Sequence, residues 1–433
     1  MSMIYYSLNY NSPESNFENA TRKGLAPDKG LYFPKDITKL DDSFFDEIEK
    51  LSYSEIAFQA IKQFVGSEIS ESALKIIIEE SINFDFPLIK IENSISTIEL
   101  FHGPTMAFKD VGAHFMARCV KYFNRNKKNN VTVLVATSGD TGGAVANGFY
   151  NLDGVDVVIL YPKNRVSSVQ KKQLTTLGKN ITAIELNGTF DDCQEMVKKA
   201  FLDKEITSKK ELTSANSINI ARWLPQMFYF MFAYRDLKKI NKQIVFSVPS
   251  GNFGNICAGM IAHKLGFPFK KFIAANNINN VVERYLSTKI YDPVSSIQTI
   301  SNAMDVGCPS NFIRIKKIYN DNYDELKSNL SVFSFSDLAT RKAILKIFKN
   351  TGYIADPHGA LGYLACVEYL KTNPNVHTVF LETAHPAKFL DTIEPIIKKK
   401  IKLPNQIQSI INKSEVSTEV KNYNEFKENL LRI

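Results

Sequence analysis

The feature that most constrains this chain is a repeated order of apolar strand, short turn and helix. Val131–Ala136 and Ile244–Val248 have buried-strand patterns, and each is followed by a glycine-rich turn and a helical pattern. Further short strand patterns occupy residues 155–160, 181–186, 272–275 and 376–381. Because strand, turn and helix in repetition build parallel sheets, the sequence predicts an α/β protein with two doubly wound lobes.

The first part of the chain departs from this pattern. Turns such as Ala26–Gly30 alternate there with helical stretches, and the polar residues Asp41–Ser43 offer an N-cap for one of these helices. We expect residues 1–95 to form a mostly helical N-terminal domain. Residues 96–433 would contain the two lobes and a C-terminal extension, with a hinge between the lobes near Trp223–Pro225.

Composition narrows the classes of protein. With 44% hydrophobic residues the chain can bury a large core, which excludes general disorder. A net charge of +8 over 433 residues is too dilute for a dedicated nucleic-acid binder. The start resembles no signal peptide, no apolar run approaches the ~20 residues of a bilayer span, and the five cysteines are dispersed without a CxxC pair. We expect a cytoplasmic protein with free thiols, no metal site, no membrane or nucleic-acid partner and no obligate protein partner.

Two glycine-rich turns that follow predicted strands are candidate anion sites. Ser250–Asn255 opens a helix, so its backbone N–H groups and the positive helix end can hold a phosphate; the alternative is a tight turn without a ligand. Thr137–Gly143 places three hydroxyls at a helix start, which predicts a nest for a carboxylate or phosphate. The alternative there is that Ser138 or Asp140 caps the helix.

Lys109 is a candidate reactive amine. It directly follows Phe108 near the start of a helix predicted through Phe115–Val120, which Thr105 can cap. Apolar neighbours and a positive helix end both lower the pKa of a lysine, as imine formation requires. The alternative is a solvated surface lysine. An amine of this kind, a phosphate cup and a carboxylate nest together describe a pyridoxal 5′-phosphate enzyme that acts on an amino acid.

Five motifs in order resemble those of the threonine synthase family, in its long-chain branch, over nearly the whole chain. They are GLAPDKGLYFP (24–34), FHGPTMAFKD (101–110), TSGDTG (137–142), SGNFGN (250–255) and ETAHPAKF (382–389). The resemblance implies the tryptophan synthase β-like fold of fold-type-II pyridoxal-phosphate enzymes. It also implies that residues 96–433 form the pyridoxal-phosphate-dependent region.

The resemblance also implies how the cofactor is held. Lys109 would bind pyridoxal 5′-phosphate as an imine and then serve as general acid and base. The hydroxyl of Thr383 would face the pyridine nitrogen. The cofactor phosphate would be held by the backbone of Gly251, Asn252, Phe253, Gly254 and Asn255.

Seven residues are implied in substrate binding: Thr137, Ser138, Asp140, Thr141, Asn216, Ser217 and Arg222. Arg222 would clamp a substrate phosphate bidentately, with Asn216 and Ser217 as further donors. Many fold-type-II relatives have asparagine where this chain has Asp140, and an ionised Asp140 cannot donate a hydrogen bond to the cofactor's phenolic oxygen.

The implied activity is that of a carbon–oxygen lyase acting on a phosphate ester. It eliminates phosphate from the γ carbon of O-phospho-L-homoserine and adds water at the β carbon, which gives L-threonine in the last step of threonine biosynthesis. A serine or threonine dehydratase, or a cysteine synthase-like β-replacement enzyme, is the alternative within the same fold. A silent homologue that only binds a phosphorylated ligand and a nucleotide-binding Rossmann module are alternatives of other classes. The absence of GxGxxG weakens the last.

The histidines are expected to have structural roles. His102 and His385 lie inside the motifs, and His358 lies at the start of a predicted helix, where it would pack or cap. No spacing of histidine, cysteine or carboxylate residues indicates a metal site.

Overall fold

The computed structural model describes residues 3–126 and 130–433, and within these residues the strands form three sheets. A small antiparallel sheet pairs β1 (Tyr5–Ser7) with β2 (Tyr32–Pro34). A six-stranded sheet has the order β11 (Leu330–Ser334), β10 (Phe269–Asn276), β9 (Ile244–Pro249), β12 (His377–Glu382), β4 (Ile95–Glu99) and β3 (Leu88–Glu92). A five-stranded sheet has the order β13 (Thr418–Val420), β7 (Ile181–Leu186), β6 (Val155–Pro162), β5 (Val131–Ala136) and β8 (Glu211–Ser214).

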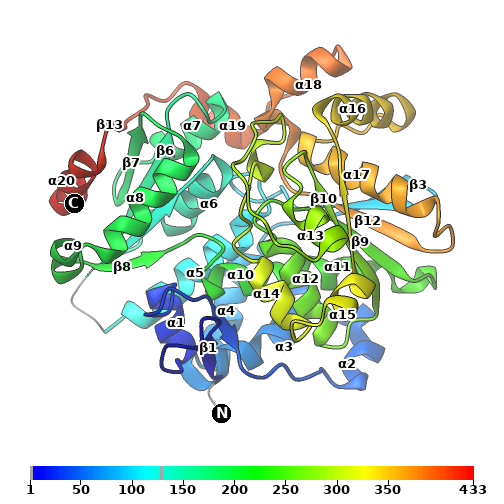
Figure 1. The fold of residues 1–433 in the computed structure, drawn as a ribbon, viewed down its shortest axis with the longest axis horizontal. Helices are drawn as coiled ribbons and strands as arrows, with labels where there is room; N and C mark the ends of the chain where they lie inside the picture. The colour runs from blue at the N-terminus through cyan, green and yellow to red at the C-terminus, as the bar shows by residue number, and fades with distance from the viewer. Residues whose placement is uncertain (1–2, 127–129) are drawn as a thin grey trace.

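The two larger sheets form two lobes that lie side by side (Figure 1). All strand pairs of the five-stranded sheet are parallel, and in the six-stranded sheet only the edge hairpin β3–β4 is antiparallel among the described residues. The predicted α/β class with two doubly wound lobes is therefore confirmed. Each of the six strand patterns noted in the sequence falls on a strand.

The N-terminal region supplies α1 (Phe17–Lys23), α2 (Asp42–Glu47), α3 (Tyr53–Val65) and α4 (Glu71–Ser81). Asp41 stands at the N-cap of α2 as expected, but its side chain makes no capping hydrogen bond within the described residues. The helix gives way to a 3₁₀ turn at Ile48. A full capping box, Ser52 with Glu55, instead starts α3. The predicted domain boundary at residue 95 falls on the first residue of β4, and the division into 1–95 and 96–433 remains a prediction.

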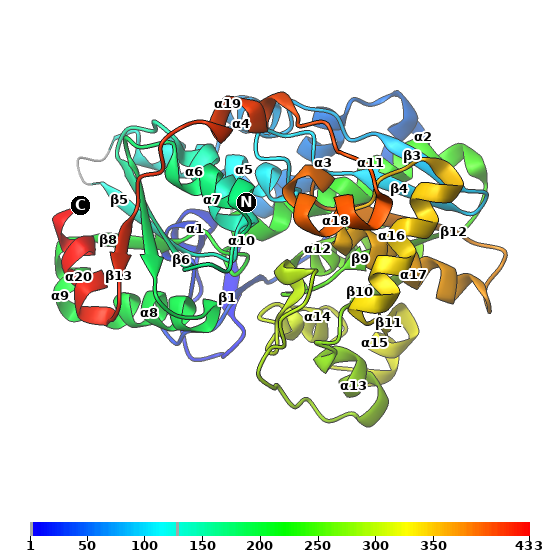
Figure 2. The same ribbon diagram turned by 90° about the horizontal axis from the view of Figure 1, so that it is seen from above.

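Helices cover both large sheets (Figures 1 and 2). Those around the five-stranded sheet are α5 (Lys109–Asn124), α6 (Asp140–Phe149), α7 (Ser168–Thr175), α8 (Phe190–Leu202) and α9 (Lys204–Lys209). The following helices are α10 (Ile220–Trp223), α11 (Phe228–Leu237), α12 (Gly254–Lys264), α13 (Val281–Thr288), α14 (Phe312–Ile318), α15 (Tyr323–Asn329), α16 (Asp337–Thr351), α17 (Pro357–Leu370) and α18 (Leu390–Ile397). The chain ends with α19 (Asn405–Ile411) and α20 (Tyr423–Arg432).

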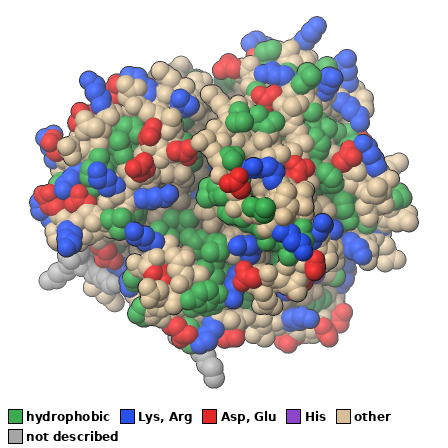
Figure 3. Space-filling model, in the orientation of Figure 1, with side chains coloured by type: hydrophobic (Ala, Val, Ile, Leu, Met, Phe, Trp, Pro, Cys, Tyr) green, Lys and Arg blue, Asp and Glu red, His purple; other side chains and the backbone are tan. Residues whose placement is uncertain are grey.

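The chain connects the lobes in both directions. The connection from β8 to β9 runs through Trp223–Pro225, where a hinge was predicted, but this segment is completely buried in the main core. After α18 the chain returns to the other lobe, where β13 pairs with β7 and α20 packs on α8 and α9 (Figure 2). Positive side chains are spread among negative ones over the face in Figure 3, in keeping with the dilute net charge.

Candidate active site

A cavity of about 900 Å³ is lined by residues of both lobes. Ala136, Pro249 and Thr383 line it at the carboxyl ends of β5, β9 and β12. This is the edge at which doubly wound sheets bind ligands, because loops and helix N-termini converge there. Lys109 and the turn Ser250–Asn255 also line the cavity.

Lys109 is the first residue of α5, and its side chain extends over the ring of Phe108, with Nζ 5.6 Å from the ring centre. Burial lowers the pKa of Lys109 to about 8; the carboxylate of Asp140 opposes this shift, and the positive charges of Lys388 and Arg222 add to it. Roughly a tenth of the amine is therefore neutral at pH 7, far more than for a lysine with its ordinary pKa. The expected depression of this pKa is found, with burial as its main cause.

The prediction that Thr105 caps this helix is wrong. Its backbone N–H donates to Oδ2 of Asp110 at 2.9 Å, and its hydroxyl donates to Oδ1 of the same carboxylate. Thr105 is thus a donor to a side chain of the helix, whereas an N-cap would accept from the helix backbone. Within the described residues no side chain caps α5, whose N-cap residue is Phe108.

The turn before α12 has the shape of an anion cradle. Phe253 adopts a left-handed conformation with φ of 59°, and Gly254 begins the helix without a side-chain cap from the described residues. A Cβ on Gly251 would lie 2.7 Å from the carbonyl oxygen of Ala303, so only glycine fits. Both polar atoms of the Asn255 side chain are buried and have no partner in the described part of the chain. Of these two atoms Nδ2 is a donor, and together with the backbone N–H groups at the helix start it fits the phosphate of a cofactor.

Thr383 and Lys109 are brought together by a direct backbone contact. The N–H of Phe108 donates to the carbonyl oxygen of Thr383 at 2.9 Å. The residue before the lysine is therefore bonded to the end of β12. Lys109, Thr383 and the turn at Gly251–Asn255, which the resemblance assigned to one cofactor, thus line the same cavity.

In the turn after β5, some residues line the cavity and others hold the turn together. Ser138 and Thr141 line the cavity. Thr137 is turned inward, where its hydroxyl oxygen accepts from the N–H groups of Gly139 and Gly142 at 2.9 and 2.8 Å. The alternative that Ser138 or Asp140 caps α6 is wrong, because Gly139 is the N-cap residue and it is the Thr137 hydroxyl that accepts from an N–H of the first turn, that of Gly142.

Asn216, Ser217 and Arg222 also line the cavity, and Ser217 lies beside the turn before α12, since a Cβ on Gly254 would lie 3.3 Å from its Cβ. The guanidinium of Arg222 already donates from Nε to the carbonyl oxygen of Ala215 at 2.9 Å and from Nη1 to that of Lys109 at 2.8 Å. Among the contacts described, Nη2 has no partner, so it is the nitrogen that can bind a ligand. Burial lowers the pKa of Arg222 to about 10, which leaves it charged at neutral pH.

His358 packs as expected, since it is buried with its ring centre 5.2 Å from that of Phe389, and it also lines the cavity. Its Nδ1 lies 2.5 Å from Oδ1 of Asp356, and its Nε2 accepts from the N–H of Ala303 at 3.3 Å. Asp356 is the residue that caps α17. The contact of His358 with Ala303 could not be predicted from the sequence, because it joins segments 55 residues apart.

Neither a metal-binding group nor a membrane span is found in the described residues. No group of three or more histidine, cysteine or acidic side chains could hold a metal ion there. No helix of the described part is both long and apolar enough to cross a bilayer.

The fold and the cavity define the class of protein, a fold-type-II pyridoxal-phosphate enzyme. Residues 98–383 match the family model for pyridoxal-phosphate dependent enzymes. Serine racemase from maize shares this fold, with a TM-score of 0.55 at 14% identity over 72% of this chain and 92% of that one.

Similarity over the whole chain is more specific. Residues 4–82 match the family model of the threonine synthase N terminus, and residues 359–429 match that of the threonine synthase C-terminal region. Threonine synthase from Buchnera aphidicola subsp. Acyrthosiphon pisum is 42% identical over 95% of both chains. The crystal structure of threonine synthase from Escherichia coli has a TM-score of 0.94 at 38% identity, covering 99% of this chain and 100% of that one. The chain belongs to the threonine synthase family and is a pyridoxal-phosphate-dependent enzyme, as its motifs predicted.

Proposed function

We propose that the enzyme converts O-phospho-L-homoserine and water into L-threonine and phosphate. The observation that carries this proposal is that one cavity holds two groups suited to phosphate. One is the turn Gly251–Asn255, and the other is Arg222 with Asn216 and Ser217. A dehydratase or a β-replacement enzyme needs only the first, because its substrate carries no phosphate.

The cofactor would be held by Lys109, by the backbone of Gly251–Asn255 and by the Thr383 hydroxyl. When bound, pyridoxal phosphate supplies an electron sink that stabilises negative charge on the carbons next to the substrate amine. Asn255 adds a side chain whose free donor lies in the cradle.

The other side chains of the cavity would bind the substrate and transfer protons. Ser138 and Thr141 would hold the substrate carboxylate, while Nη2 of Arg222 holds the phosphate that leaves from the γ carbon. Lys109 would remove and return protons at the α carbon, because an amine with a pKa of about 8 exchanges protons readily near neutral pH.

The cellular setting is part of the same proposal. The five cysteines are all free thiols, four of them buried, which favours a reducing compartment such as the cytoplasm. We propose a small-molecule enzyme with an N-terminal domain over residues 1–95 and a pyridoxal-phosphate region over residues 96–433.

Steady-state kinetics of the purified enzyme test the proposed reaction. We expect phosphate release from O-phospho-L-homoserine in step with threonine formation, and little deamination of L-serine or L-threonine. Lys109→Ala should abolish both the activity and the absorbance of the bound cofactor. Selective deamination of serine would instead establish a dehydratase.

A further inference from the structure

Lys388 is a buried charge in the described structure for which the reaction above has no use. It ends the 3₁₀ turn Pro386–Lys388, a few residues after Thr383, and its side chain is completely buried. Its Nζ lies 2.7 Å from Oδ1 of Asp140, whose side chain is only 5% exposed. Taking an ammonium group and a carboxylate out of water is costly, so each requires the other.

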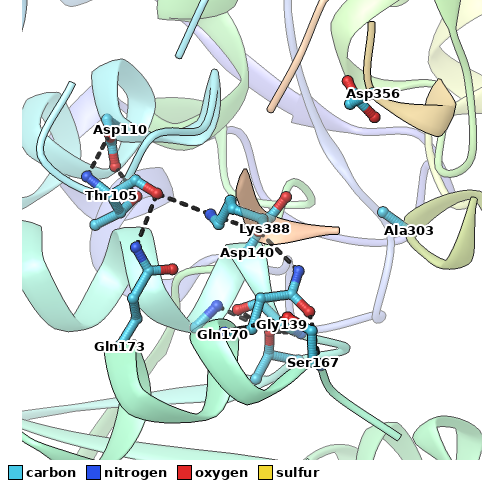
Figure 4. A network of polar contacts seen from close by, with 12 residues as sticks. Thr105, Asp110, Gly139, Asp140, Ser167, Gln170, Gln173, Ala303, Asp356 and Lys388 are labelled. Carbon is cyan, nitrogen blue, oxygen red and sulfur yellow. Dashed lines mark hydrogen bonds and ion pairs between the residues drawn. The ribbon is translucent and has the colours of Figure 1, made fainter. Parts of the chain in front are cut away.

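Polar contacts on both sides hold this pair in place (Figure 4). Nζ of Lys388 donates to the carbonyl oxygen of Thr105 at 2.8 Å, and Nε2 of Gln173 donates to the same oxygen at 3.0 Å. Nε2 of Gln170 donates to Oδ1 of Asp140 at 2.9 Å. The network joins the turn after β12 in one lobe to α6 and α7 in the other, next to the start of α5.

The charges around Lys109 make this pair relevant to the reactive amine. The charges of Asp140 on α6, Lys388 after β12 and Arg222 on α10 all act on the Lys109 amine. Nη1 of Arg222 also donates to the carbonyl oxygen of Lys109. Asp140 favours the charged form of Lys109, and the two cations favour the neutral form. Lys388 also faces Asp110 and His385.

Asp140 itself is ionised because of the same neighbours. Burial alone would raise its pKa, but the charges of Lys388 and Lys109 hold the pKa of Asp140 well below its ordinary value. If Lys388 were removed, the carboxylate would face Lys109 with no other cation in contact among the described groups. The amine would then hold its proton more tightly.

We propose that Lys388 is a positioning residue that neutralises Asp140 and so keeps the Lys109 amine free to react with the cofactor aldehyde. The proposal rests on the role proposed above for Lys109. It also accounts for an aspartate in this turn: Asp140 serves as the partner of Lys388, and no hydrogen bond from it to the cofactor is required.

The test is the rate at which apoenzyme takes up pyridoxal phosphate, followed by absorbance from pH 6 to pH 10. The rate follows the neutral fraction of Lys109, and titration of the free cofactor is the same for every variant. The quantity compared is the pH at the midpoint of the rise in uptake rate. We expect Lys388→Met to raise this midpoint by about one pH unit and Asp140→Asn to lower it by a similar amount. The midpoint of the double variant should lie close to that of the parent enzyme, and so should the midpoint of Lys388→Arg. The exposed, ion-paired Lys400 offers a matched control, Lys400→Met, with no shift.

The proposal is overturned if the two single variants shift the midpoint in the same direction, or if Lys388→Arg shifts it as far as Lys388→Met. A merely structural role would not produce opposite shifts that cancel in the double variant. If Lys388→Met fails to fold, as judged by circular dichroism, Asp140→Asn and Lys388→Arg decide the question. Lys109→Ala must abolish the absorbance change; if it does not, the role of Lys109 fails, independently of Lys388.

Discussion

Side chains at the cavity have two roles: they can bind a ligand, and they form hydrogen bonds with the surrounding protein. Arg222 shows this most clearly, because Nε donates to the carbonyl oxygen of Ala215 and Nη1 donates to that of Lys109 at the start of α5. The same guanidinium would hold the substrate phosphate. Hydrogen bonds within the protein therefore orient Nη2, and they do not depend on the substrate.

Replacing Arg222 tests its role in phosphate binding. Arg222→Lys keeps the charge but loses the planar fork, and one charge-assisted hydrogen bond is worth about 1.5–3 kcal/mol. We expect kcat/KM for O-phospho-L-homoserine, measured on enzyme that holds its cofactor, to fall roughly 10- to 100-fold. Unchanged kcat/KM would show that the phosphate binds elsewhere.

Lys109 makes the unfolding free energy of the apoprotein depend on pH. Its pKa falls from 10.5 in the unfolded chain to about 8 in the fold, so the unfolded state binds more protons between these values. Stability contributed by this residue is lowest below pH 8 and rises with pH up to about 10.5. We expect the difference in unfolding free energy, parent minus Lys109→Met, to rise by about 3 kcal/mol across that window. Urea titrations at pH 7 and pH 10 measure it, and a flat difference would contradict the buried amine.

At the scale of elements, long buried strands were predictable and short edge strands were not. β5 and β9 are six-residue apolar runs that end in glycine-rich turns, and such runs are recognisable locally. β8, β11 and β13 have three to five residues, and their pairing with a neighbouring strand defines them. Lys109 and Thr383 could be found because a contiguous motif surrounds each. Lys388 lies in the same motif as Thr383, but its pairing with Asp140, like that of His358 with Ala303, could not be predicted because the partners lie far along the chain.

The turn before α12 offers a test of the cradle. In Gly251→Ala the new Cβ meets backbone atoms of Ala303 and Met304 at 2.7 and 2.9 Å, so the turn must move. We expect a stability loss of about 1–3 kcal/mol and faster loss of cofactor on dialysis. Gly143→Ala is the control, since its Cβ makes ordinary contacts from 3.4 Å outward. Equal cofactor retention in the two variants would rule out a tight fit at Gly251.

At the scale of the whole molecule, the returning C-terminal segment fastens one lobe to the other. β13 extends the five-stranded sheet, and Phe426 and Leu430 of α20 enter the core formed with Cys193 and Val197 of α8. This lobe therefore completes its core with the last part of the chain, which arrives from the opposite lobe. The connection limits how far the lobes can separate around the cavity.

Phe426→Ala should show whether this fastening stabilises the lobe. The side chain is completely buried, and truncating a buried phenylalanine costs about 3–5 kcal/mol. Because Phe426 packs inside the five-stranded lobe, we expect urea unfolding of this variant to separate into two transitions. Glu428→Ala, on the exposed side of the same helix, should change stability by less than about 0.5 kcal/mol. One cooperative transition with cofactor release at its midpoint would mean that the two lobes unfold as a single unit.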